Sequence, residues 1–89
     1  MVKVILTHEV KNFREWKIGF DADEPQRVHA GVKTNGLYTS VINPNMVTII
    51  FDFPSTEDFD EFMARPDLTK RMTEAGVISR PEVLVLNQM

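Results

Sequence analysis

The sequence predicts an α+β fold in which four β-strands and two helical segments follow one another as β-α-β-β-α-β. Segments rich in β-branched residues stand at both ends of the chain, a hairpin signal stands at its centre, and two amphipathic segments with polar caps lie between them. The chain has 89 residues, of which 43% are hydrophobic and 26% charged. We therefore expect a single domain, residues 1–89, around one core.

The first strand is expected at residues 2–10, where apolar and polar residues alternate. His8 continues the apolar face of this strand and is predicted to point between the sheet and the first helix. Asn12 and Glu15 have the layout of a capping box, in which each side chain reaches a backbone N–H of the first turn. A helix is therefore predicted to begin directly after Asn12.

The inward stripe of this first helix begins aromatic and ends charged. Residues placed 100° apart share one stripe in the order Phe13, Trp16, Phe20, Asp23 and Arg27. Pro25 lies inside the helix, where it removes a hydrogen bond to the Asp21 carbonyl. We expect a kink near residues 23–24 and an end at Gly31.

The next two strands are expected at residues 33–42 and 46–53, joined as an antiparallel hairpin by the turn residues Asn43-Pro44-Asn45. We predict that Ile42 lies opposite Met46. This register makes one face of the hairpin apolar, with Leu37, Thr39, Val41, Val47, Ile49 and Phe51. The other face then carries Gly36, Tyr38, Ser40, Thr48, Ile50 and Asp52.

The second helical segment is predicted to begin at a cap formed by residues 55–58 and to be restarted by Pro66. Its apolar residues recur at helical spacing: Phe59, Phe62, Met63, Leu68, Met72 and Ala75. Gly76 is a natural stop for this segment. A short last strand is expected at residues 82–86.

This order of elements favours a four-stranded antiparallel sheet with both helical segments on one face, the ferredoxin-like arrangement. The other face would carry Ile5, Tyr38, Ile50 and two residues of the last strand. A soluble monomer rarely exposes a contiguous apolar sheet surface. We therefore predict that a second copy packs against it face to face, giving a homodimeric α+β barrel.

Composition excludes several classes of partner and site. The net charge of −3 and the dispersed basic residues argue against nucleic acid. With no cysteine there is no disulfide, thiolate nucleophile or thiolate metal site. The N-terminal segment turns polar at residues 7–9, which predicts no signal peptide, no membrane span and a cytoplasmic location. We expect no metal site, because His8, His29, Asp23 and Asp52 lack ligand spacing, and no cofactor.

The string His8-x-Val10-x-Asn12-Phe13-x-x-Trp16-Lys17-x-x-Phe20-Asp21 resembles the start of small dimeric α+β barrel proteins. The resemblance continues through Arg27, Ala30-Gly31-Val32, Asn43-Pro44-Asn45, Phe51-Asp52-Phe53, Pro66-Asp67-Leu68, Met72, Ala75-Gly76-Val77 and Pro81-Glu82. That superfamily includes antibiotic-biosynthesis-type monooxygenases, polyketide cyclases, haem-degrading enzymes, muconolactone isomerases and many members with no assigned function. Similar proteins often have a His where this chain has Asp23. The resemblance implies a fold rather than one reaction.

Three residues are candidates for catalysis. His8 is a candidate general base, because imidazole titrates near neutral pH; the alternative is a buried histidine bonded to a backbone carbonyl or to Asn12. Asp23 and Arg27 lie one turn apart, which fits a simple ion pair. They also share the aromatic stripe, so they could ring a pocket mouth where Arg27 holds an enolate or carboxylate.

Five further residues are candidates for substrate binding: Trp16, Phe20, Tyr38, Phe51 and Asp52. Trp16, Phe20 and Phe51 would form apolar walls, although packing alone would also explain Trp16. Tyr38 and Asp52 face the dimer side of the predicted sheet, where an interface hydrogen bond is the alternative.

Two functions remain open. One is a cofactor-independent enzyme of the monooxygenase, cyclase or isomerase kind, acting on a small aromatic or enolisable compound. The other is a non-catalytic dimeric module that binds a small organic ligand or takes part in a stress response. A connected cavity of a few hundred Å³ that reaches His8 would favour the enzyme, and an interior filled by its own aromatic side chains would favour the module.

Overall fold

The computed structural model describes the backbone of residues 1–89 and the side chains of residues 1–65 and 70–89. The elements follow in the order β1 (Val2–Glu9), α1 (Phe13–Ala22), α2 (Glu24–His29), β2 (Lys33–Thr39), β3 (Met46–Phe53), α3 (Thr56–Met63), α4 (Pro66–Glu74) and β4 (Glu82–Asn87). The predicted α+β class is confirmed. Each of the two expected helical segments consists of two helices.

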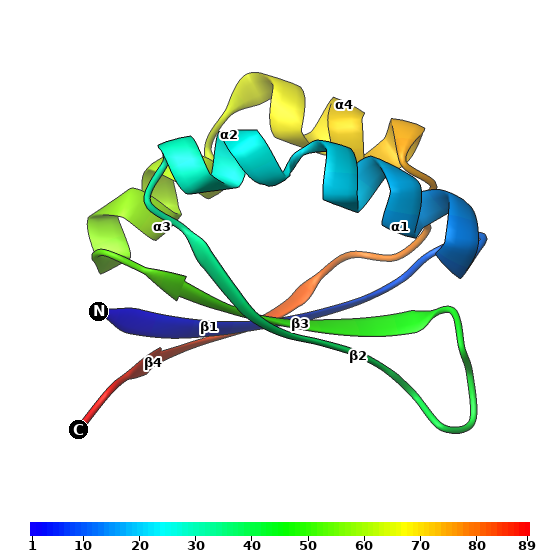
Figure 1. Ribbon diagram of the computed structural model, residues 1–89, viewed down its shortest axis with the longest axis horizontal. Coiled ribbons are helices and arrows are strands. Elements are labelled where there is room, and N and C mark those ends of the chain that lie inside the picture. Colours follow the sequence, from blue (N-terminus) through cyan, green and yellow to red (C-terminus); the bar gives the residue numbers. More distant parts are fainter.

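The sheet is antiparallel throughout, in the strand order β2-β3-β1-β4. All four helices lie on one of its faces, as Figure 1 shows, and the opposite face carries no helix. We call these the inner and the outer face. Residues alternate between them along β1, so that Val4 is fully buried on the inner face while its neighbour Ile5 lies on the outer one.

The break in the first helical segment has the predicted cause. Asp23 ends α1 and begins α2, and Pro25 occupies the first turn of α2, where its missing N–H costs nothing. At the start of α1, the Asn12 side chain accepts a hydrogen bond from the Glu15 N–H at 3.1 Å. Gly31, with a φ of +79°, ends the segment.

The second helical segment repeats this plan. Ser55 caps α3 by accepting from the Asp58 N–H at 3.1 Å, and Pro66 begins α4. Gly76, with a φ of +90°, ends α4. The predicted inward position of Leu68 lies outside the described side chains.

The register predicted for the central hairpin is wrong. In the structure, Thr39 pairs with Val47. The predicted pairing of Ile42 with Met46 would have put Thr39 opposite Ile49, two residues further along β3. A shift of two residues leaves the side chains of the paired residues 36–39 and 47–50 on the faces that were predicted for them, because the side-chain period of a strand is two. A bulge between Thr34 and Gly36 interrupts the pairing near the start of β2.

The predicted strand at residues 33–42 is too long. β2 ends at Thr39, and the Ser40 hydroxyl accepts hydrogen bonds from the backbone N–H groups of Ile42 and Asn43 at 3.2 and 3.3 Å. This local bonding competes with strand pairing. Val41 was expected on the apolar face, but Val41 and Ile42 are exposed in the loop.

The outer face carries a contiguous apolar patch. Ile5 pairs with Ile50 on one side and with Leu84 on the other, so these side chains are neighbours across three strands. We define the outer patch as Ile5, Tyr38, Ile50, Leu84 and Leu86. Tyr38 and Leu84 are 57% and 59% exposed. Among the described residues, no helix is long and apolar enough to cross a membrane.

Candidate functional site

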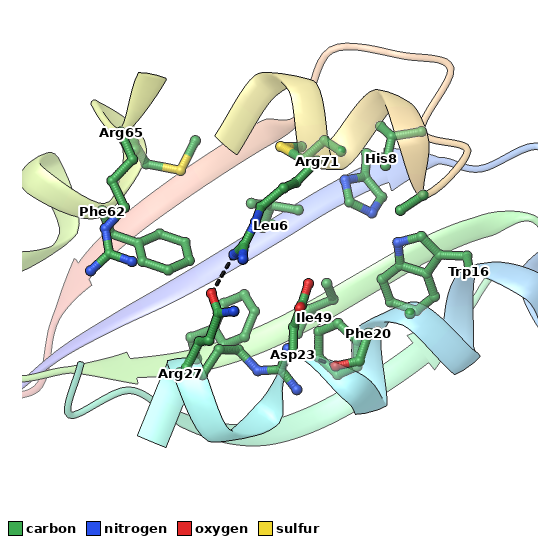
Figure 2. A pocket seen from close by; sticks show the side chains of 17 residues that line it. Leu6, His8, Trp16, Phe20, Asp23, Arg27, Ile49, Phe62, Arg65 and Arg71 are labelled. Carbon is green, nitrogen blue, oxygen red and sulfur yellow. Dashed lines mark hydrogen bonds between the residues drawn. The ribbon is translucent and has the colours of Figure 1, made fainter. Parts of the chain in front are cut away.

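A cavity of about 130 Å³ lies between the inner face of the sheet and the helices. Figure 2 shows His8 and Trp16 at one end and Phe62 with Arg65 at the other. The floor comes from β1 and β3, and the walls come from the two helical segments. The described side chains that line it include Leu6, His8, Trp16, Phe20, Asp23, Gln26, Arg27, Ile49, Phe51, Phe62, Met63, Arg65, Arg71 and Met72.

His8 reaches this cavity from β1. The alternation of the strand places its ring under α1, where it is 4% exposed and meets Trp16 edge to face, with ring centroids 5.7 Å apart. Neither ring nitrogen has a hydrogen-bond partner among the described residues. The alternative bond to a backbone carbonyl or to Asn12 is therefore not formed in the described part of the chain, and the Asn12 side chain caps α1 instead.

Burial determines the charge state of His8. Removal from water disfavours the imidazolium and lowers the pKa of His8 below its ordinary value of 6.5. The ring is therefore neutral at physiological pH. A neutral imidazole has one nitrogen lone pair that can accept a proton and one N–H that can donate.

An aromatic stack forms the wall beside His8. Trp16 and Phe20 lie one turn apart on α1 and stack with ring centroids 4.8 Å apart. Phe20 in turn packs against Phe51 of β3, with ring centroids 6.4 Å apart, and this pair joins the helix to the sheet. This end of the cavity is apolar and flat-walled, which suits a planar ring.

Arg27 continues this stack. Its guanidinium lies over the Phe20 ring, 3.7 Å from the centroid, and donates to the Phe20 carbonyl at 2.8 Å. Arg27 is only 7% exposed, and its Nε–H has no partner among the described residues. Burial lowers the pKa of Arg27, while Glu24, Asp23 and Asp21 raise it, and the group stays charged.

Asp23 and Arg27 do not form the simple ion pair. Among the described side chains, no carboxylate oxygen of Asp23 lies within 4.0 Å of a guanidinium nitrogen of Arg27. Asp23 is half-buried at the junction of α1 and α2 and lines the cavity. The break between these two helices is what places both residues at the pocket.

The cavity also holds two arginines that the sequence did not point to, Arg71 at its middle and Arg65 at the end away from His8 (Figure 2). Arg71 of α4 donates a hydrogen bond to the Gln26 side-chain carbonyl of α2, so the two helical segments are bridged across the pocket (Figure 2). Arg65 lies over Phe62, 5.4 Å from the ring centroid. One signal could have found Arg71, because it precedes Ala75 by four residues and so shares the inward stripe of α4.

Tyr38 and Asp52 do not join this pocket. Both lie on the outer face, where Asp52 contacts Lys3 at 3.7 Å and accepts a hydrogen bond from the Asn35 amide. Of the eight predicted site residues, the structure brings six together: His8, Trp16, Asp23, Phe20, Arg27 and Phe51. No group of three or more metal-ligating side chains occurs among the described residues.

The chain shares its fold with solved structures. No protein-family model matches the sequence, and no curated protein matches it. A candidate antibiotic biosynthesis monooxygenase from Bordetella bronchiseptica has a TM-score of 0.78 at 18% identity, over 99% of this chain and 96% of that one. A second such candidate, from Nitrosomonas europaea, has a TM-score of 0.72 at 10% identity, over 100% and 99%.

A third similar structure is that of a conserved protein from Methanosarcina mazei, with a TM-score of 0.74 at 13% identity, over 99% of this chain and 92% of that one. These likenesses run over the whole length of this chain. They confirm the ferredoxin-like α+β fold, which these monooxygenase-like proteins have in common. At such low identity they establish the fold alone.

Proposed function

We propose that this chain is a cofactor-independent enzyme of the monooxygenase, cyclase or isomerase kind, with His8 as general base toward a small aromatic or enolisable compound. One observation carries the proposal: both nitrogens of the His8 ring are buried beside a cavity without a partner among the described residues. Buried polar groups are nearly always hydrogen-bonded, and an exception calls for an explanation. A bound compound with an acidic C–H or O–H would supply the missing partner.

The proposed step is a proton transfer. The lone pair of the neutral imidazole takes a proton from a carbon or oxygen of the bound compound, and the electrons of the broken bond remain on the compound. An enolate or phenolate and an imidazolium result, so charge is conserved within the pocket. The lowered pKa of His8 keeps the base in its neutral form at pH 7.

Arg27 is proposed to hold the charge that develops. Its Nε–H, which has no partner among the described residues, offers a donor to an oxyanion, and its stack on Phe20 fixes the guanidinium in advance. Asp23, which also lines the cavity, is proposed to support the charge of Arg27: burial lowers the pKa of Arg27, and Glu24, Asp23 and Asp21 oppose that effect. Trp16, Phe20 and Phe51 would serve as apolar walls.

The fate of the deprotonated compound depends on its own structure. Reprotonation at another carbon would be an isomerisation, and attack of the enolate on a carbonyl of the same molecule would be a cyclisation. Reaction of a deprotonated CH₂ group with O₂ would give a carbonyl and one water, a monooxygenation. The names of the Bordetella and Nitrosomonas proteins make this last reaction the first to try.

We also propose that the outer patch is covered by a second copy of the chain. Leu84 and Tyr38 are more than half exposed, and Ile5 with Ile50 joins them into one apolar surface. Polar side chains beside the patch are already paired, as in the 2.9 Å hydrogen bond between Thr7 and Thr48. Such a surface is self-complementary under a two-fold axis.

A ligand-binding module without turnover is the second candidate. It is favoured by the modest size of the cavity, because the Trp16–Phe20 stack occupies part of the space that a larger substrate would need. In this case His8 would donate or accept a hydrogen bond without taking a proton.

The test is solvent deuterium exchange. Small 1,3-diketones are incubated with the protein in D₂O, and loss of the signal of their acidic C–H group is followed by NMR. We expect the protein to accelerate exchange for at least one compound, and His8→Gln to reduce this acceleration roughly 10²- to 10⁴-fold, the usual contribution of a general base. His29→Gln is the matched control, because His29 is exposed at the end of α2.

Equal acceleration by His8→Gln and the unmodified protein would contradict the assignment of the base. Binding of a compound without any exchange would favour the module.

A further inference from the structure

Positive charge gathers around the pocket of a protein that is acidic as a whole. The chain has a net charge of −3, yet three of its five arginines, Arg27, Arg65 and Arg71, line the cavity. Asp23 is the single carboxylate among the described lining residues. Clustered arginines with few acidic neighbours favour an anion.

The three arginines are spread along the cavity. Arg27 lies beside the aromatic stack, because its guanidinium is held over Phe20. Arg71 is half-buried on α4 and reaches into the middle of the cavity, and Arg65 is exposed at the end away from His8, where α4 begins (Figure 2). The pocket therefore has a cation near the aromatic stack, one at its middle and one at its far end.

The contact between Arg71 and Gln26 shows which kind of group the middle of the cavity can accept. The acceptor is a neutral amide oxygen on α2 that faces a guanidinium on α4. A carboxylate oxygen forms a stronger, charge-assisted bond with arginine, and it can use two N–H groups at once. A carboxylate in the pocket would therefore replace the Gln26 oxygen on Arg71.

The end of the cavity beside His8 suits an apolar ring instead of an anion. Trp16 and Phe20 form a flat apolar wall, and His8 is neutral. A buried apolar cavity of about 150 Å³ is large enough to hold a benzene ring. A cavity of about 130 Å³ is slightly smaller, so its ligand can have no more than one ring.

We infer that the ligand of this pocket is a small planar carboxylate, whose acid group binds Arg71 while its ring lies against Trp16 and Phe20. Arg65, beside Phe62, adds to the positive charge that attracts the acid group. This inference rests on the proposed function and names its substrate class. The carboxylate replaces the Gln26 oxygen on Arg71 and ties α2 to α4 through the ligand. The proton that His8 removes belongs to the ring end of the ligand, and the acid group serves only for binding.

The experiment compares salicylate with salicylamide, which have the same ring and hydroxyl but differ in charge. Binding is followed by fluorescence of Trp16, the single tryptophan of the chain, which lies in the wall of the cavity. We expect salicylate to bind roughly tenfold more tightly than salicylamide or better, as for a hydrogen bond to a charged group. We also expect this preference to shrink as salt is added.

Two variants test the residues. Arg71→Gln should bring the affinity for salicylate close to that for salicylamide, and Arg65→Gln, at an exposed position, should reduce the preference by a smaller factor. Arg80→Gln is the control, because Arg80 is exposed and does not line the pocket. Gln26→Ala should strengthen salicylate binding, since one acceptor that competes for Arg71 is removed.

The outcomes separate this inference from the proposed function. Equal binding of the two compounds, both quenching Trp16, would overturn the carboxylate assignment and leave the base at His8 intact. A preference for salicylate that survives Arg71→Gln and Arg65→Gln would overturn the role of these two arginines. No response of Trp16 to either compound up to its solubility limit would contradict the ligand pocket itself, and with it both proposals.

Discussion

The inner and outer faces of the sheet differ in how their polar groups are satisfied. On the outer face, Thr7 bonds to Thr48, and Asp52 contacts both Lys3 and Asn35. On the inner side, His8 and Arg27 are buried with nitrogens that have no partner among the described residues.

This difference indicates two kinds of surface on one sheet. A face whose polar groups are already paired can be covered by apolar contact alone, as packing between two copies requires. Unpaired buried groups beside a cavity instead need a ligand to complete them. This difference supports the proposals of small-molecule binding on the inner side and self-association on the outer side.

The largest effect is expected from a pair of neighbouring residues in β3. Ile49 is 2% exposed on the inner face, and Ile50 is half-buried on the outer face. Ile49→Ala should lower the free energy of unfolding by about 2–5 kcal/mol, because it leaves a cavity in a packed core. Ile50→Ala should cost about 1 kcal/mol or less when denaturation is measured at a protein concentration low enough to dissociate a dimer. Similar losses of unfolding free energy for both variants would contradict the difference in burial between the two faces.

The next effect concerns self-association. Leu84→Glu places a charge in the outer patch and should raise the dissociation constant of the dimer roughly hundredfold or more, because a buried charge without a partner costs several kcal/mol. Sedimentation equilibrium measures this change. Ile18→Glu is the control, since Ile18 is 72% exposed on α1, on the helical side of the sheet. A chain that is monomeric before substitution, or a dimer that Leu84→Glu leaves intact, would contradict this use of the outer face.

The smallest effect is a pH dependence of stability. The pKa of His8 is lowered in the folded chain, so the unfolded chain binds a proton more readily as pH falls below the ordinary value of 6.5. The contribution of His8 to the free energy of unfolding is fully present above pH 6.5. It is lost as the pH falls from there toward the lowered pKa of the folded chain. Urea denaturation at pH 7 and pH 5 should show a smaller loss for His8→Gln than for His29→Gln. The same loss in both variants would indicate that His8 is not buried in its neutral form.

The sequence was sufficient for features that depend on local chemistry. Alternation in β1 placed His8 on the inner face, and Pro25 and Pro66 marked the breaks that divide each helical segment. Each of these features follows from the period of a strand or from the geometry of proline, and neither requires knowledge of distant residues.

Two features were not predictable in this way. The first is local: the Ser40 hydroxyl accepts hydrogen bonds from the backbone N–H groups of Ile42 and Asn43, and this turn ends β2 earlier than strand propensity suggests. The second depends on contacts between distant segments. Arg71 was overlooked because a charged residue on an apolar stripe contradicts the pattern used to find the stripe. Its partner Gln26 is 45 residues away in the chain, and only the packing of α2 beside α4 brings the two together.

The most direct test of the division between the two faces is a map of NMR shift changes during titration with salicylate. We predict saturable changes at the Trp16 indole and at the backbone amides of His8 and Ile49, with Tyr38 and Leu84 unchanged. Changes centred on Tyr38 and Leu84, with Trp16 and His8 unaffected, would contradict the assignment of the ligand site to the inner side of the sheet.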